Sequence, residues 1–423
     1  MLMFLLAMLP IIFLIIALSG LKMPGYKACP IALVITIVEA LFIWKQGPLE
    51  VATGTLEGFV MAIWPICLVI VAAVFTYNLV VHTKNMDVIK RMLTSVSKDK
   101  RILVLIIAWG FGGFMEGMAG FGTAVAIPAG ILIGLGSIGI PTVTAANVAG
   151  TDPMQTAVYV VLQLSVMVIL VPFFVVYMTG KQCGAKGLSA FKGVGLITLI
   201  SGVAFVIPQF LTAKFVGAEL PAVIGSVICM AVTIIFAKLL RKGKTTEFDI
   251  ESEERSESVN LKKGLVAWSP FILVLIFLLV TSSLVPAING PLASVKSNIP
   301  IYTGEGAAPY TVTWIATPGV LILIAAFIGG LIQKCPVKEI FKVLGATVKQ
   351  MSKTIITIMA VLGTAKVMGY SGMTQNIADF IVSITGRFYP LVAPLIGSIG
   401  TFVTGSATSS SVLFAKLQYS TAV

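Results

Sequence analysis

The stretch from Trp109 to Pro128, WGFGGFMEGMAGFGTAVAIP, constrains the fold more than any other part of the sequence. It lies inside a long apolar region, yet it contains the carboxylate Glu116 and six glycines. A glycine costs about 1 kcal/mol in a helix interior, and an unpaired charge at membrane depth is also costly. Non-helical backbone is tolerated there where protein or a water-filled cavity surrounds it. We predict that a membrane helix breaks here near the midplane, with Glu116 lining a site. The alternative is a glycine-rich packing face in which Glu116 pairs with a buried partner.

The composition identifies the class of protein to which this stretch belongs. Hydrophobic residues make up 57% of the chain and charged residues only 11%, whereas soluble proteins carry about 25% charged residues. Many apolar runs are long enough to cross about 30 Å of hydrocarbon. We therefore predict an all-α polytopic protein of the cell membrane, with about ten to twelve membrane segments. The net charge of +12 then reflects cytoplasmic loops. We expect no nucleic-acid partner, because no basic groove with interleaved aromatic residues is apparent.

The chain divides into two hydrophobic halves, 1–240 and 264–423, which are joined by a charged segment at 241–263. That segment has mixed charges and no apolar periodicity, so we predict a solvated, flexible linker. The many Lys and Arg residues of 82–101 place this loop in the cytoplasm, and the Lys and Arg residues that flank the linker place it there as well. Residues 287–313 are expected to form an outer loop, and Glu50 and Glu57 to lie in a polar connection. Apolar helices are expected at 2–18, 28–44, 59–81, 157–178, 193–213, 219–240, 264–286, 314–333 and 354–370.

The two halves carry a weak internal repeat. Phe114–Ala119 aligns with Phe402–Ala407, and upstream Met86 aligns with Met373. The helix expected at 59–81 runs toward the cytoplasm, whereas its counterpart at 354–370 runs away from it. Inverted repeats with interrupted helices in matching places are typical of secondary transporters, whose binding site lies where the interruptions meet. We therefore predict inverted repeats with discontinuous or re-entrant helices near 116–122 and 404–411.

Polar side chains near these interruptions are the candidate site residues. Lys366 lies in the middle of an apolar helix, too central to reach water easily; the alternative role is an ion pair with Glu116 or Asp152. The run 404–411 supplies hydroxyls and free N–H groups that suit a carboxylate; the alternative is small-residue packing. Asp152 lies in NVAGTDPMQT (147–156), which is either a second unwound element or a polar loop whose aspartate caps the next helix.

Several weaker signals favour other functions and are set aside. The GxGxxG match at 134–139 follows a membrane segment and has no acidic residue about 20 positions later, so helix contact explains it better than a dinucleotide site. The five cysteines are far apart and show no metal-binding or disulfide pattern. Because the sole histidine, His82, lies at a basic edge and no catalytic motif occurs, we expect neither an enzyme nor a metal or cofactor. A channel would need a continuous polar lining along its pore, whereas the polar groups here are concentrated at the two interruptions.

Four stretches resemble the L-lactate permease family: GFMEGMAGFGTAVAIPA, AKVMGYSGM, FVTGSATSSSVLFAKLQ and GAELPAVIG. The resemblance extends over essentially the whole chain. The family pattern often has Asp where Ala407 stands and Asn where Ser411 stands. The family also continues past the third motif, so we expect the half 264–423 to be truncated relative to it. By position, the resemblance implies that the substrate-binding residues are Gly117, Gly120, Gly122, Lys366, Tyr370, Ser371, Thr404, Ser406, Thr408, Ser409 and Ser410. Gly405 belongs to the third motif.

The resemblance implies transport of lactate or glycolate together with protons. Glu116 is the first candidate for the proton-carrying residue. A carboxyl at a helix break is desolvated, and the negative charge of an arriving anion would cause it to bind a proton. Asp152 is the second candidate. Two alternatives remain open: an organic-acid transporter coupled to Na⁺, and an organic-anion channel. The expected partners are therefore a small monocarboxylate, H⁺ and the lipid bilayer, and the formation of a homodimer is left open.

Overall fold

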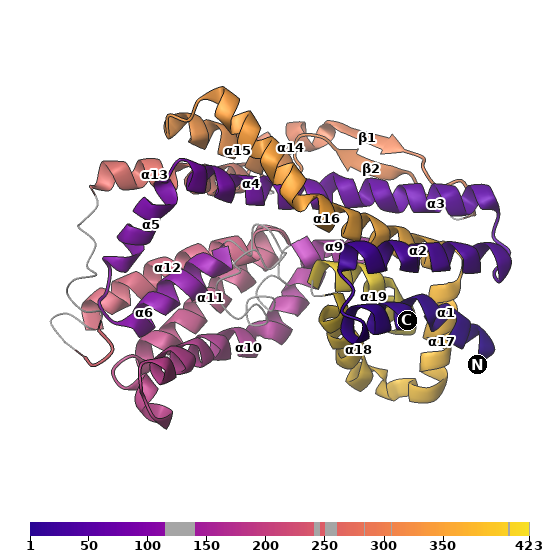
Figure 1. Ribbon diagram of the computed structural model, residues 1–423, viewed down its shortest axis with the longest axis horizontal. Coiled ribbons are helices and arrows are strands. Elements are labelled where there is room, and N and C mark those ends of the chain that lie inside the picture. Colours follow the sequence, from indigo (N-terminus) through magenta and orange to yellow (C-terminus); the bar gives the residue numbers. More distant parts are fainter. Residues whose placement is uncertain are drawn as a thin grey trace.

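The computed structural model describes residues 1–114, 140–240, 246–249, 260–282, 284–305, 307–404 and 407–422. These residues form helices almost throughout, with one short β-hairpin (Figure 1). Among them, eight helices are long and apolar enough to cross a membrane, and Pro318–Ile332 is a shorter apolar helix. The prediction of an all-α polytopic membrane protein is confirmed.

The bounds of the elements are as follows. The first half contains α1 (Leu2–Ile15), η1 (Ile16–Gly20), α2 (Gly25–Phe42), α3 (Pro48–Met61), η2 (Ala62–Cys67), α4 (Leu68–His82), α5 (Asn85–Thr94), α6 (Lys100–Val104), η3 (Leu105–Phe111), α9 (Ile140–Ala149), α10 (Pro153–Gln182), η4 (Gly187–Phe191), α11 (Gly195–Phe215) and α12 (Pro221–Leu240). The second half contains α13 (Leu261–Val280), α14 (Pro286–Ser294), β1 (Lys296–Ile299), β2 (Tyr310–Thr313), α15 (Pro318–Ile332), α16 (Val337–Tyr370), α17 (Met373–Thr385), η6 (Gly386–Phe388), α18 (Tyr389–Thr404) and α19 (Ala407–Ala422).

Two long helical segments form the seam between the halves. The first, α3–η2–α4, is continuous from Pro48 to His82 apart from a bend where Trp64 leaves helical geometry before Pro65. The second is α16, with 34 residues. A Cβ at Gly54 would lie 3.1 Å from Tyr370, near the end of α16. Asn78, near the end of α4, donates a hydrogen bond to Thr347, near the beginning of α16. The two segments therefore run antiparallel, as the predicted inverted repeat requires.

Both long segments begin earlier than the sequence predicted. The expected polar connection around Glu50 and Glu57 is instead the first part of α3, which begins with Pro48 and has Glu50 accepting from the N–H of Gly47. Proline at the first helical position and an acidic residue in the first turn both favour a helix start. The segment 337–353 is amphipathic and continues without interruption into the apolar part of α16. A search for long apolar runs therefore misses the polar first turns of these two helices.

The segments after α4 and α16 also correspond. Each long helix is followed by a short helix, α5 or α17, whose N-cap residue has a left-handed backbone: Lys84 at φ 57° and Gly372 at φ 84°. The methionines that align in the sequence, Met86 and Met373, lie at the starts of these helices and are buried. The correspondence between the two repeats that was inferred from the sequence therefore extends to the backbone conformation at the starts of α5 and α17.

The second predicted discontinuity coincides with a helix end. Helix α18 ends at Thr404 and α19 begins at Ala407. Gln418 in α19 donates a hydrogen bond to the carbonyl of Ala393 in α18, so the two helices form an antiparallel hairpin. Each has 16 residues and spans only about 24 Å, less than the hydrocarbon thickness. Helix α19 also packs against α9, the first described helix after the glycine-rich stretch (Figure 1).

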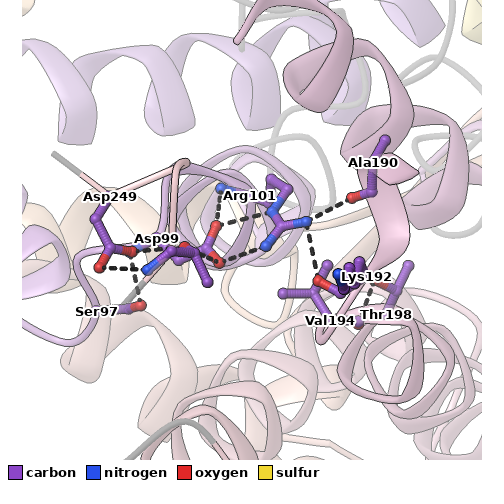
Figure 2. Close-up of polar contacts among 9 residues, drawn as sticks. Ser97, Asp99, Arg101, Ala190, Lys192, Val194, Thr198 and Asp249 are labelled. Atoms are coloured by element: carbon purple, nitrogen blue, oxygen red, sulfur yellow. Dashed lines mark hydrogen bonds and ion pairs between the residues drawn. The ribbon is translucent and has the colours of Figure 1, made fainter. Parts of the chain in front are cut away.

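The described linker residues 246–249 contact the first half beside Asp99 (Figure 2). Asp99 and Arg101, which are 2% and 0% exposed, form a two-pronged ion pair with a shortest distance of 2.8 Å. Arg101 also donates to the carbonyls of Ala190 and Lys192. The ring of Phe248 in the linker lies 3.7 Å from its guanidinium group and is itself buried. The expectation of a wholly solvated linker is therefore wrong for 246–249, because Phe248 stacks on this cation.

The expected outer loop contains ordered structure. It includes α14 and a hairpin in which β1 and β2 pair antiparallel. The hairpin lies beside α3 (Figure 1), and Tyr310 donates a hydrogen bond to the carbonyl of Trp64 at the bend. Burial, with a smaller contribution from Glu57, raises the pKa of Tyr310 to about 12. The hairpin is thus attached to the same helix that carries Glu57.

Candidate functional site

Glu57 is the central residue of the candidate site. It lies nine residues after Pro48, roughly 14 Å along the axis of α3, and is only 3% exposed. It belongs to the buried face of this helix, with Val51, Gly54 and Gly58. A buried carboxylate in a membrane helix requires a partner.

That partner comes from the other half of the chain. The Lys366 Nζ of α16 lies 2.7 Å from Glu57 Oε1. One turn later on α16, the Tyr370 hydroxyl lies 2.9 Å from both oxygens of Glu57 and 3.4 Å from Lys366 Nζ. The i to i+4 spacing places Lys366 and Tyr370 on one face of the helix. The carboxylate is therefore bound by one cation and one hydroxyl donor.

Two glycines allow the helices to approach closely enough for these contacts. A Cβ at Gly58 would lie 2.7 Å from the Cα of Gly363, which is closer than real Cβ contacts allow. Gly363 faces Phe59 and Leu33 in turn. Such small-residue contacts bring membrane helices together. The backbones of α3 and α16 thus meet one turn from the Glu57–Lys366 pair.

An aromatic ring from the segment 287–313 covers Tyr370, and an amide group from the connection between α2 and α3 binds that ring's hydroxyl. The ring of Tyr302 stacks on the ring of Tyr370 with a centroid distance of 3.6 Å and an interplanar angle of 3°. The Tyr302 hydroxyl accepts a hydrogen bond from Gln46, in the connection between α2 and α3. Burial raises the pKa of Tyr302, so its phenol remains neutral. Lys366 retains partial exposure, with 26% of its side chain accessible against 4% for Glu57.

The arrangement has a simple electrostatic consequence. The Glu57–Lys366 pair is neutral as a unit, and each charge compensates the other in a low-dielectric environment. A small carboxylate that reached the partly exposed Lys366 would compete with Glu57 for the same cation. Charge-assisted hydrogen bonds of this type contribute about 1.5–3 kcal/mol each. Replacement of one carboxylate partner of Lys366 by another would therefore preserve the compensation of its charge.

The structure brings together only some of the residues that the sequence predicted. Lys366 and Tyr370 meet at Glu57, while Ser371 caps the end of α16 and donates to the carbonyl of Met368. Asp152 is an exposed N-cap of α10 that accepts from the N–H groups of Met154 and Gln155. Thr404, Thr408, Ser409 and Ser410 lie at the facing ends of α18 and α19. Residues Glu116, Gly117, Gly120, Gly122, Gly405 and Ser406 lie outside the described residues.

The comparisons with known proteins bear on this site. A sequence model of the L-lactate permease family matches residues 3–137 and 135–423. The chain belongs to this family. It is 46% identical to the L-lactate permease of Streptococcus iniae over 98% of this chain and 89% of the relative. It is 31% identical to the glycolate permease GlcA of Escherichia coli (strain K12) over 99% and 83%. It is 30% identical to the L-lactate permease of Bacillus subtilis (strain 168) over 99% and 83%.

Glu57 is the residue of the candidate site that was not predicted from the sequence. From the sequence, Glu57 was expected in a polar connection, and its partner lies 309 positions away. The signal that was present is the spacing of Gly54, Glu57 and Gly58, which share one face of a helix that begins at Pro48. Lys366 was expected to pair, as an alternative role, with Glu116 or Asp152. Within the described residues its ion-pair partner is Glu57 instead.

Proposed function

We propose that this protein carries L-lactate across the cell membrane together with a proton. The observation that carries the proposal is the buried ion pair between Glu57 of the first half and Lys366 of the second. Membership of the L-lactate permease family and the names of the relatives, which include L-lactate permeases and a glycolate permease, support this class of substrate.

Lys366 is the proposed partner of the lactate carboxylate. It is the partly exposed member of the pair, and its position beside Tyr370 places a hydroxyl within reach of the 2-hydroxyl group of the same substrate. The hydroxyls and N–H groups around 404–410, and the glycines at 117, 120 and 122, are proposed to complete the site from the interrupted helices.

Charge balance supports coupling to a proton. The empty site is neutral, because Glu57 compensates Lys366. When lactate replaces Glu57 at Lys366, a proton bound by Glu57 makes the loaded site neutral again. Lactate alone would leave one net negative charge, and a proton alone one net positive charge, and both are costly at membrane depth. Only the empty site and the site loaded with both lactate and a proton are then neutral, so only these two states of the protein move readily between the two sides of the membrane. Glu116 remains the sequence-based candidate for the same proton-carrying role.

The test is lactate uptake into proteoliposomes containing the purified protein. Uptake against a lactate gradient is expected when the outside is more acidic than the inside, and not when a Na⁺ gradient of the same size replaces the pH gradient. Uptake that follows Na⁺ and ignores the pH gradient would show a Na⁺-coupled transporter. Uptake that only runs downhill under every gradient would show transport that is not coupled to an ion, as through a channel.

The matched variants are Glu57→Gln and Glu116→Gln, each measured for exchange and for proton-driven accumulation. Loss of accumulation in only one of them identifies the carboxyl that couples proton and substrate. Normal accumulation in Glu57→Gln would remove Glu57 from the proposal and leave lactate transport itself intact.

A further inference from the structure

A second carboxyl, Glu39 in α2, lies buried in the same seam. It is 5% exposed, although it lies in a helix that is long and apolar enough to cross a membrane. Neither of its carboxyl oxygens has a hydrogen-bond partner within the part of the chain that the structure describes. In this respect it differs from Glu57, which has two partners. An ionised carboxylate without a partner is strongly disfavoured in such surroundings, whereas the neutral acid is tolerated.

The register of the helices places Glu39 near the Glu57 site. Helix α2 runs parallel to α16: a Cβ at Gly25 would contact Thr357, and Leu33 lies beside Gly363. Ala40 belongs to a core cluster with Val367 and Met368. Glu39, which precedes Ala40, is therefore level with the turn of α16 that carries Lys366 and Tyr370.

No charged group in the neighbouring described helices is available to compensate Glu39. Helix α1 has no titratable side chain. Helix α3 contributes Glu50, bound at its own N-terminus, and Glu57, bound to Lys366 and Tyr370 of α16. The other charged residues of α16 precede Thr357 and lie toward the opposite end of α2, as do Tyr26, Lys27 and Cys29 of α2 itself. Asp379 of α17 is exposed and accepts from Gln375.

The location of Glu39 makes its environment dependent on conformation. Helix α2 belongs to the first half of the chain and α16 to the second, and the two pack closely. Alternating access in transporters with inverted repeats moves one part of the protein against the other. A carboxyl buried in that seam loses contact with water when the seam closes and gains it when the seam opens. Its proton occupancy is therefore linked to the conformation.

We propose that Glu39 is a second proton-binding residue of the transport cycle, protonated while α2 and α16 are packed together and ionised when they separate. The proposal rests on the proton-coupled transport of lactate proposed above. The proton comes from water on one side, forms the O–H bond of the Glu39 acid, and leaves to water on the other side. Since Glu57 already balances the charge of the lactate anion, the proton on Glu39 is an additional charge. Each cycle then moves two protons with one lactate, a net transfer of one positive charge.

The test measures how lactate accumulation in proteoliposomes depends on membrane potential, set with K⁺ and valinomycin at a fixed pH gradient. For the wild-type protein, the accumulation ratio is expected to change about tenfold for each 59 mV or so, as for one transferred charge. In Glu39→Gln, which keeps the size and polarity of the side chain, this dependence is expected to disappear. Glu39→Asp retains an acid and should retain the dependence. Glu50→Gln, a carboxyl in the first turn of α3 outside the proposed machinery, serves as the control.

The outcomes distinguish this inference from the proposed function. If the pH gradient drives accumulation in the wild-type protein but the potential has no effect, the role of Glu39 is overturned while proton-coupled transport stands. If lactate accumulation by Glu39→Gln depends on the membrane potential as strongly as accumulation by the wild-type protein, the proposed role of Glu39 is also overturned. If Glu39→Gln cannot be purified, infrared difference spectra of the wild-type protein and Glu39→Asp with and without lactate decide instead. A change in the C=O stretch of a buried carboxylic acid that shifts in Glu39→Asp supports the inference, and identical spectra in the two proteins overturn it.

Discussion

Glu57 and Lys366 are separated by 309 residues in the chain, and their side chains meet at 2.7 Å. The contact joins α3 and α16, which belong to opposite halves and run antiparallel. Because one partner comes from each half of the sequence, a movement of α3 against α16 would break or re-form the pair. Conversely, a ligand that binds one arrangement of the pair better than the other would shift the equilibrium between them.

Glu57→Gln is expected to separate exchange from accumulation. The glutamine keeps hydrogen-bonding groups near Lys366 and Tyr370 but cannot take up a proton. Lactate-for-lactate exchange should continue, since it needs no net proton movement, while a pH gradient should no longer drive uphill uptake. Both are measured with labelled lactate in proteoliposomes. Accumulation equal to that of the wild-type protein would show that Glu57 does not couple proton and substrate.

Lys366→Ala is expected to weaken lactate binding by about one to two orders of magnitude, because one charge-assisted contact contributes about 1.5–3 kcal/mol. The single variant leaves Glu57 buried without its cation, which also destabilises the fold. The double variant Glu57→Gln with Lys366→Ala removes both charges and is the matched control for folding. Lactate affinity is measured by calorimetry on purified protein. If the double variant binds lactate as tightly as the wild-type protein, Lys366 is not part of the site.

The sequence predicted the class of fold and most helices because their main signal, long apolar runs, is local. The prediction failed where a residue is buried because it has a partner that lies far away in the sequence. Glu57 and the turns before it were assigned to a connection because nothing within α3 shows that Lys366 lies opposite. Phe248 was assigned to a solvated linker because Arg101, its stacking partner, lies 147 positions earlier. Lys366 was a candidate from the sequence because a lysine in an apolar helix is conspicuous by itself, and Tyr370 was implied by the family resemblance. That they bind substrate stays a prediction.

The same reasoning explains the outcome for Asp152. A carboxylate directly before a helix and next to Pro153 has a local function as an N-cap, which sequence analysis already held as the alternative. The structure has this cap. Residues around Glu116 lie outside the described part of the chain, so its role stays a prediction.

Gly58→Ala is expected to abolish transport, although alanine raises the helix propensity of α3 by about 1 kcal/mol. An added methyl group would lie 2.7 Å from the backbone of Gly363, so α3 and α16 must move apart and the contact between Glu57 and Lys366 must lengthen. Gly345→Ala is the control on α16, since a Cβ there meets nothing within 4 Å and alanine favours the helix by about 1 kcal/mol. Initial rates of lactate uptake are compared at equal amounts of reconstituted protein. Equal rates in the two variants would mean that the close helix contact is not required.

Arg101→Met is expected to destabilise the protein without altering the transport site itself. The substitution leaves Asp99 buried without its cation, removes two hydrogen bonds to the turn at 190–192 and removes the surface on which Phe248 stacks. Breaking a buried pair by removing one partner typically costs about 3–5 kcal/mol. Thermal unfolding in detergent, followed by fluorescence, should show a clearly lower midpoint, while Arg91→Met, at an exposed position of α5, should not change it. Adding Asp99→Asn to Arg101→Met should recover part of the loss, because no buried charge then remains unpaired. An unchanged midpoint in Arg101→Met would show that the Asp99–Arg101 pair does not contribute to stability.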